Sequence, residues 1–158
     1  MSEIVIPDLD DAAEVEGLLG RIGGPDDLRA LLDAPGVDDA AIDAFVDAAG
    51  PSRVLDRLFS IMGERFVPER AGDAAGVVQW SVGTPSGVFT YHVAIADGRA
   101  RGERGAYTGA VVSLRISTPD LLRLCAGRLN PVTGFTAGRI KLQGDMMFGA
   151  KLSAWFDH

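Results

Sequence analysis

Histidine is the side chain best suited to acid–base catalysis near neutral pH, and this 158-residue chain has two. His92 stands in a segment where apolar and polar residues alternate, so a strand there places it on the face opposite Tyr91. As a general base His92 would need a carboxylate to orient it, and Glu103 and Asp97 are the nearest candidates. A small enzyme that acts on an apolar substrate with His92 as base is therefore one functional hypothesis. The alternative, which we favour, is a hydrogen-bonded or exposed histidine of a sheet.

A thiol is the second reactive group, and Cys125 is the only cysteine. One cysteine excludes an internal disulfide and a multi-cysteine metal site, and two histidines leave little for a histidine-rich one. Cys125 lies on a predicted helix between Leu124 and Ala126, where cysteine is more often a small buried apolar residue than a nucleophile. The sequence also lacks the G-x-S-x-G elbow, the P-loop, the dinucleotide fingerprint and the H-E-x-x-H metal motif. Beyond His92 we expect no catalytic residue, no metal site and no cofactor.

Three arginines, Arg99, Arg101 and Arg104, lie in a glycine-flanked run between Gly98 and Gly105. A guanidinium fork matches phosphate and carboxylate groups, so this run is suited to lipid head groups or an anionic membrane surface. The alternative is a solvated turn and an edge strand protected by its charges. Both interpretations stay open.

The net charge of −7 conceals an asymmetry along the chain. Residues 1–50 hold 13 acidic and 2 basic side chains, a net −11, whereas residues 51–158 hold 9 acidic and 13 basic ones, a net +4. The acidic segment can fold against the basic part, repel anionic surfaces from it, or be a solvated appendage. Since basic residues are few and the whole chain is acidic, we expect no nucleic-acid binding.

Composition is typical of a soluble globular protein, with 47% apolar and 23% charged residues. No apolar run approaches the roughly 20 residues needed to span a bilayer, and the acidic start lacks the basic region of a signal peptide. The last residues are not a peroxisomal address of the Ser-Lys-Leu type. We expect a cytoplasmic protein, and the Ala-, Gly-, Asp- and Arg-rich composition suggests a bacterial source.

Helical periodicity dominates the first 66 residues. Residues 10–50 predict three short helices, each too short to be stable alone, so their apolar stripes must dock on each other, on the rest of the chain or on a partner. A longer helix is expected from Ser52, a good N-cap, to about Phe66, with Pro68 ending it.

Strand periodicity follows, in three alternating segments around Trp80, Tyr91 and Leu114. The short connections at 84–87 and 96–98 favour hairpins. The resulting sheet has one apolar face, and the helices expected to cover it are 53–66, 119–129 (with Thr118 as cap), 132–137 and 146–156. We therefore predict an α+β fold with one mainly antiparallel sheet of about five strands and helices packed on one face.

The final helix is unusual because it is apolar nearly all round. From Met146 to Phe156 only Lys151 and Ser153 interrupt its apolar residues, although a surface helix normally keeps a polar half. Such a helix must be covered on both sides by protein, lipid or ligand. Methionines are flexible, so those at its start suit varied apolar ligands.

The segment around this helix resembles the C-terminal signature of the sterol carrier protein type 2 family. The matching residues are Asn130-Pro131, Gly134-Phe135, Gly138 to Leu142, Gly144-Asp145-Met146 and Ala150-Lys151-Leu152. With the order of elements upstream, the resemblance extends over about residues 52–158. It implies binding or transfer of a lipid without catalysis, on a domain at 51–158 that follows an acidic helical extension at 1–50.

Our leading hypothesis is a hydrophobic cavity between the sheet and the C-terminal helices. Its ligand would be a fatty acyl, sterol-like, polyprenyl or polyketide-type molecule. The residues expected to line it are Phe59, Met62, Trp80, Phe89, Tyr91, Leu114, Phe135, Ile140, Leu142, Met146, Met147, Phe148, Leu152 and Phe156.

A different class of function also fits the resemblance. Domains of this kind serve as accessory or dimerisation modules that present apolar metabolites to enzymes, as in quinone pathways. The helices of residues 10–50 would then contact a partner enzyme or a second copy of the chain.

Overall fold

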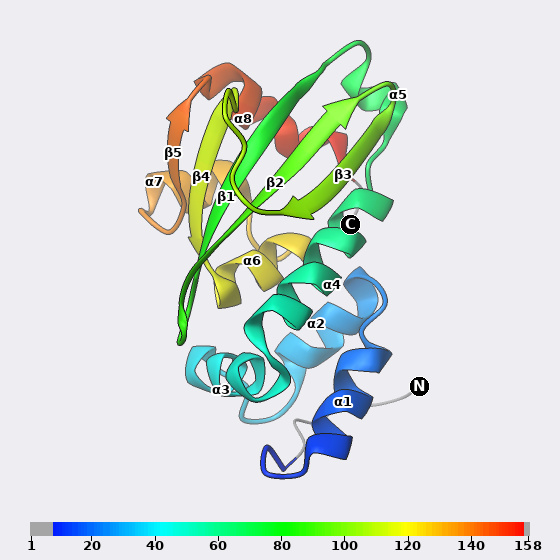
Figure 1. Ribbon diagram of the computed structural model, residues 1–158, viewed down its shortest axis with the longest axis vertical. Coiled ribbons are helices and arrows are strands. Elements are labelled where there is room, and N and C mark those ends of the chain that lie inside the picture. The colour runs from blue at the N-terminus through cyan, green and yellow to red at the C-terminus, as the bar shows by residue number, and fades with distance from the viewer. Residues whose placement is uncertain (1–7, 157–158) are drawn as a thin grey trace.

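The alternating segments form one five-stranded sheet in the computed structural model, which describes residues 8–156 (Figure 1). The neighbouring strands pair antiparallel, except that β1 and β4 pair in parallel at the centre. The predicted α+β fold with a mainly antiparallel sheet is therefore confirmed. The strands lie in the order β3-β2-β1-β4-β5, with β1 at Gly76–Thr84, β2 at Gly87–Ala96, β3 at Arg99–Arg104, β4 at Val112–Ser117 and β5 at Lys141–Gly144.

Both predicted hairpins form, and their turn residues explain why. Between β1 and β2, the Thr84 hydroxyl donates to the carbonyl of Gly87 at 2.7 Å and accepts from the Ser86 amide at 3.1 Å. Between β2 and β3, Asp97 and Gly98 both have positive φ, at 55° and 74°. Two consecutive residues with positive φ make the turn whose twist matches that of paired strands.

Helices cover the apolar face of the sheet, and together with β5 they enclose the site described below. They are α4 (Pro51–Glu64), α6 (Thr118–Cys125), α7 (Pro131–Thr136) and α8 (Met146–Leu152), followed by a 3₁₀ turn η1 (Ser153–Trp155), and the short α5 (Pro68–Ala71) leads from α4 to β1.

Two helix starts differ from the prediction, by two residues for α4 and by one for α6. α4 begins at Pro51, so Ser52 lies inside the helix instead of capping it. Ser117 caps α6, because the Thr118 hydroxyl instead donates to the carbonyl of Gly83 at 2.8 Å. A second hydrogen-bond acceptor nearby in the fold, which local sequence does not show, decides which hydroxyl caps the helix.

The final helix is shorter than predicted, since 146–156 divides into α8 and η1. Phe156 pairs with Phe66 as an isolated antiparallel bridge, and the Val67 amide donates to the carbonyl of Trp155 at 2.7 Å. These backbone bonds to a distant segment replace those of a continuing helix. The predicted helix 119–129 likewise ends early, at Cys125.

The acidic N-terminal helices α1 (Ala12–Arg21), α2 (Pro25–Asp33) and α3 (Asp39–Ala49) pack beside α4 and α6 at one end of the molecule (Figure 1). Leu28, Phe45 and Val46 are at most 1% exposed and belong to the same continuous hydrophobic core as the sheet. Burial of such large apolar side chains is the main source of stability for these short helices.

Ion pairs complement this packing. Arg53 pairs with Glu16, Arg123 with Asp39 and Arg128 with Asp33, the last at 3.0 and 2.9 Å, and each joins the N-terminal helices to the rest of the chain. Each exposed ion pair of this kind contributes little to the free energy of unfolding, so these pairs affect the orientation of the helices more than their stability.

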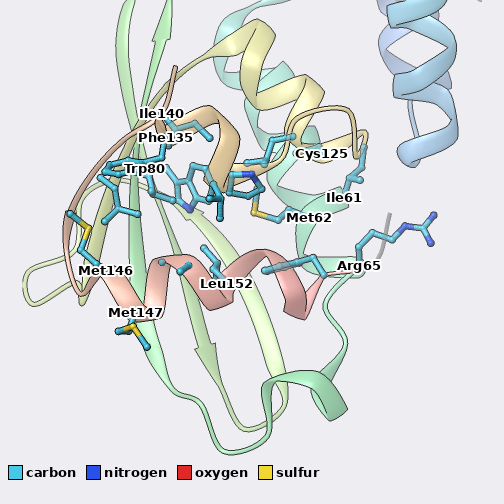
Figure 2. Close-up of a pocket in the computed structure, with 18 residues that line it drawn as sticks. Ile61, Met62, Arg65, Trp80, Cys125, Phe135, Ile140, Met146, Met147 and Leu152 are labelled. Carbon is cyan, nitrogen blue, oxygen red and sulfur yellow. The ribbon is translucent and has the colours of Figure 1, made fainter. Parts of the chain in front are cut away.

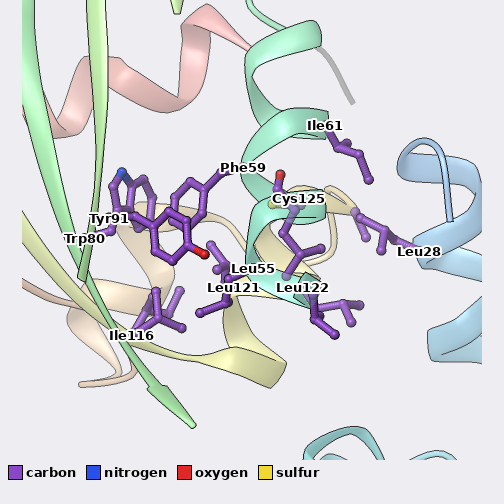
Figure 3. Packing of buried hydrophobic residues seen from close by; sticks show 14 of the residues in the cluster. Leu28, Leu55, Phe59, Ile61, Trp80, Tyr91, Ile116, Leu121, Leu122 and Cys125 are labelled. Atoms are coloured by element: carbon purple, nitrogen blue, oxygen red, sulfur yellow. Dashed lines mark hydrogen bonds between the residues drawn. The ribbon is translucent and has the colours of Figure 1, made fainter. Parts of the chain in front are cut away.

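The core between α4 and the sheet is built around Phe59. Its ring stacks on Tyr91 with 4.6 Å between centroids and meets Trp80 edge-on at 5.8 Å (Figure 3). α4 lies close against β3 because Gly102 leaves room, since a Cβ there would lie 2.9 Å from Cβ of Phe59. Among the described residues, no helix is long and apolar enough to cross a membrane.

Candidate functional site

A cavity of about 440 Å³ lies between α8 on one side and α4, α6 and α7 on the other, with the sheet as its floor (Figure 2). Its volume is within the range of small-molecule sites. The floor is a single row of side chains, because Trp80 of β1, Leu114 of β4 and Leu142 of β5 are partners in register. Their shared face was predictable from alternation, whereas their alignment depends on the parallel β1–β4 pair.

Most of the residues predicted to bind a ligand line this cavity. Ten of the fourteen do so, namely Met62, Trp80, Leu114, Phe135, Ile140, Leu142, Met146, Met147, Leu152 and Phe156. α8 approaches β5 closely because residue 149 is glycine, whose Cβ, if present, would lie 2.5 Å from Leu142 Cδ1. The apolar face of α8 and the sheet therefore form two walls of one cavity.

The structure places the other four predicted residues outside the cavity. Phe59 and Tyr91 are buried in the neighbouring core, and Phe89 is half-buried on β2. Phe148 packs edge-on against Trp155, with 5.1 Å between ring centroids. Alternation fixes the face of each residue but not its distance from the helices that enclose the cavity.

Several lining residues were not predicted. They are Ile61, Arg65, Leu124, Cys125, Pro131, Val132, Gly149 and Ala150. The helical period already placed Ile61 on the apolar stripe of α4, so that stripe was a usable signal. Arg65 had none, because a single arginine after a helix is common in surface positions.

Cys125 is a buried member of the cavity wall, at 7% exposure. Its thiol lies 3.9 Å from the carbonyl of Leu58, and burial raises the pKa of the thiol to about 12. A thiol with so high a pKa is a poor nucleophile near neutral pH. The arrangement fits a small apolar residue of the wall, as the sequence indicated.

Arg65 is the one charged residue lining the cavity within the described part of the chain. It is exposed and lies at the end of the cavity opposite Met146 and Met147 (Figure 2). Within residues 8–156 no carboxylate lies within 4 Å of its guanidinium, and its Nη2 atom lies beside Gly24 of the α1–α2 turn. The cavity is thus apolar along its length, and Arg65 extends outward from one end with its guanidinium beside the α1–α2 turn (Figure 2).

His92 faces away from the cavity, on the sheet face opposite Trp80, because it pairs in register with Gln79. Its Nδ1 lies 2.9 Å from the carbonyl of Gly105, and its Nε2 lies 3.6 Å from Glu103. A base in this position cannot reach a ligand held between α8 and the sheet. Within residues 8–156, no group of three or more potential metal ligands occurs.

The arginine run forms the edge strand β3, where Arg99 and Arg101 are exposed. Arg104 instead forms an ion pair with Asp56, and hydrogen bonds from Arg104 and from the Tyr91 hydroxyl outweigh burial and hold the pKa of that carboxyl below its usual value. Among residues 8–156 no ion-pair partner lies near Arg99 or Arg101, so these two arginines differ from Arg104.

Comparison with known proteins identifies relatives of the chain. The profile of the SCP-2 sterol transfer family matches residues 62–157. A hydroxysteroid dehydrogenase-like protein 2 of Danio rerio is 28% identical over 134 residues, which are 82% of this chain and 31% of that protein. The chain therefore spans about a third of the length of this curated relative.

Two solved structures share the fold. The palmitated SCP2L2 protein of Aedes aegypti, at 23% identity and a TM-score of 0.54, aligns over 66% of this chain and 91% of its own. The sec-alkylsulfatase Pisa1 of Pseudomonas sp., at 14% identity and a TM-score of 0.59, aligns over 93% of this chain but 30% of its own. At these identities the two structures show a common fold and no more.

Proposed function

Because this chain belongs to the SCP-2 sterol transfer family, we propose that it binds one apolar ligand in the cavity between the sheet and α8, with no bond broken. The observation that supports this is the lining, which is apolar apart from Arg65 at one end. Removing apolar ligand surface from water stabilises the complex by about 25 cal/mol per Å². The same physics serves transport, in which the ligand is later released.

The proposed ligands are single long apolar molecules of the fatty acyl, sterol-like, polyprenyl or polyketide type. A fatty acyl chain also accords with the palmitate named for the mosquito protein. The proposed contacts are the ten predicted residues that line the cavity, together with the wall residues Ile61 and Cys125. Of the lining residues, Val132 on α7 and Met146 and Met147 on α8 are exposed, so ligand exchange is proposed to take place on this side of the cavity.

A displacement titration tests the proposal. The protein is titrated with a fluorescent fatty acid, and unlabelled fatty acids, sterols and prenols compete for the site. In the variant Ala150→Trp a large side chain replaces the small one that lines the cavity, and we expect at least tenfold weaker probe binding. Ala154→Trp is the matched control, because Ala154 is exposed just beyond α8 and does not line the cavity. Equal affinities of the two variants and the unchanged protein would contradict the proposal.

An accessory role is the second candidate function. It is supported by the two longer relatives, in which a domain of this fold is about 30% of a dehydrogenase-like protein and of an alkylsulfatase. Here the chain would hold an apolar metabolite for a partner enzyme, alone or as a homodimer. A transfer assay separates the roles: a carrier moves the probe between vesicles unaided, whereas an accessory module binds it but releases it only when the enzyme is added.

Contact with an anionic membrane through Arg99 and Arg101 is a further proposal, now without Arg104. Equal partitioning of the protein onto anionic and neutral vesicles would contradict it.

A further inference from the structure

The indole nitrogen of Trp80 is the one buried side-chain nitrogen or oxygen that lacks a hydrogen-bond partner in the part of the chain that the structure describes. Trp80 is 2% exposed, yet its side chain lines the cavity (Figure 2). An indole N–H can only donate, and buried donors in native proteins are almost always paired. An unpaired donor in the wall of a binding cavity indicates that its acceptor comes from outside the chain.

The surrounding side chains cannot supply that acceptor. The register partner Leu114 and the cavity residue Leu142 beyond it are apolar. On the other side, the Tyr91 hydroxyl donates to Asp56 at 2.6 Å, and its oxygen accepts no hydrogen bond from Nε1 of Trp80. The Phe59 ring covers the indole edge-on and offers no oxygen.

A single water molecule is also a poor partner for this donor. A buried water is held by two to four polar groups. Apart from Trp80, the polar lining side chains are the buried thiol of Cys125 and Arg65 at the cavity end. A ligand oxygen differs from water because the rest of the molecule holds it in place, so one hydrogen bond is enough.

The apolar wall also restricts the kind of oxygen. A carboxylate beside Trp80 would bury a charge far from Arg65, the one lining cation among residues 8–156, which is unfavourable. A hydroxyl would bring its own O–H, which needs an acceptor that the wall lacks. A carbonyl oxygen only accepts and carries no charge, so it matches a site with one donor.

We propose that the ligand of this cavity carries a neutral carbonyl oxygen, of the ketone, ester or quinone class, which accepts a hydrogen bond from Nε1–H of Trp80. This inference rests on the proposed function, which it narrows from any apolar molecule to one with an acceptor along its body. Trp80 is well placed for selection because β1 is flanked by β2 and β4, which fix its backbone. Nε1 itself has almost no exposed surface in the ligand-free chain, so the oxygen reaches it only when a covering side chain moves aside.

Nuclear magnetic resonance of the full chain tests this directly. Nitrogen-15 spectra show the indole N–H of both tryptophans, and the spectrum of a Trp155→Phe variant assigns them. The protein is titrated with a symmetric long-chain ketone and, separately, with the alkane of the same length. We expect the Trp80 indole proton to move downfield with the ketone but not with the alkane. Trp155, which does not line the cavity, is the internal control.

The outcomes separate this inference from the proposed function. If both probes bind and the Trp80 signal responds equally to them, or to neither, the carbonyl inference is overturned while apolar binding stands. If neither probe binds, both fail. In a Trp80→Phe variant, the ratio of ketone affinity to alkane affinity should fall about three- to tenfold, the range that one hydrogen bond contributes. An unchanged ratio would also overturn the inference.

Discussion

Cys125 offers a built-in reporter of the cavity, because it is the only cysteine and its side chain belongs to the cavity wall. Any reaction of the protein with a thiol reagent therefore occurs at this one position. The perturbation we consider is modification by a chromogenic disulfide reagent at pH 8, with and without an apolar ligand.

The structure predicts how fast the Cys125 thiol reacts with the reagent. Burial raises the pKa of the thiol from 9.0 to about 12, so the reactive thiolate fraction at pH 8 falls roughly a thousandfold. Steric cover slows the reaction further, since the residue is 7% exposed. Because the folded-state pKa is raised, the rate should keep rising about tenfold per pH unit up to pH 10, where an ordinary thiol has levelled off.

The assay compares the folded chain, the chain unfolded in urea, and the folded chain saturated with a fatty acid. We expect the folded protein to react at least a thousand times more slowly than the unfolded one, and the ligand to slow it again. A Cys125→Ser variant that also carries Ala154→Cys is the control, since its exposed thiol should react fast and gain no protection. A folded rate within tenfold of the unfolded rate, or equal ligand effects on both thiols, would refute the cavity geometry.

Three further predictions concern stability and Arg65 at the end of the cavity. Asp120 should support stability above about pH 4. Burial raises the pKa of its carboxyl, but hydrogen bonds from Arg139 and Arg123 together outweigh burial and hold the pKa below its usual value. Denaturant titrations should show that Asp120→Asn costs most at pH 7 and less as the pH falls through the lowered pKa, because protonation then removes the same interaction from the parent protein. Gly102→Ala should destabilise the protein by about 1–3 kcal/mol, because the new Cβ would lie 2.9 Å from a core side chain. The control Gly83→Ala has open space around it and should change the free energy of unfolding by less than about 0.5 kcal/mol. Equal losses of unfolding free energy in the two variants would contradict this. Arg65→Gln should weaken binding of a fatty acid by about fivefold or less, because an exposed cation contributes little to binding. The affinity for the alcohol of the same length should not change. Equal changes in the affinity for both ligands, measured by calorimetry, would show that Arg65 does not contact the carboxylate.

Local patterns were sufficient for much of the fold. Alternation placed Trp80 and Leu114 on one face, and turn residues such as Gly98 specified the hairpins. The same alternation also placed Tyr91 and Phe89 on that face, although both lie outside the cavity. Trp80 and Leu114 line the cavity because β1 and β4 pair in parallel below the helices that form its walls. This pairing joins residues about 34 positions apart and depends on the whole fold.

The errors at helix ends have a similar origin. Thr118 does not cap α6 because its hydroxyl donates to Gly83, and the last helix divides because Phe156 pairs with Phe66. Each competing bond is made by a residue distant in sequence. Arg65 shows the same limit for the site, since its role at the cavity end depends on elements that only the fold brings together.

Native mass spectrometry of the intact chain tests the central claim most directly. The protein is measured as purified and again after mixing with a long-chain fatty acid or ketone, beside the Ala150→Trp variant. Binding in the cavity predicts one ligand per chain for the unchanged protein and a much smaller bound fraction for the variant. A protein that retains no apolar molecule under either condition, or a variant that retains as much as its parent, would contradict ligand binding between the sheet and α8.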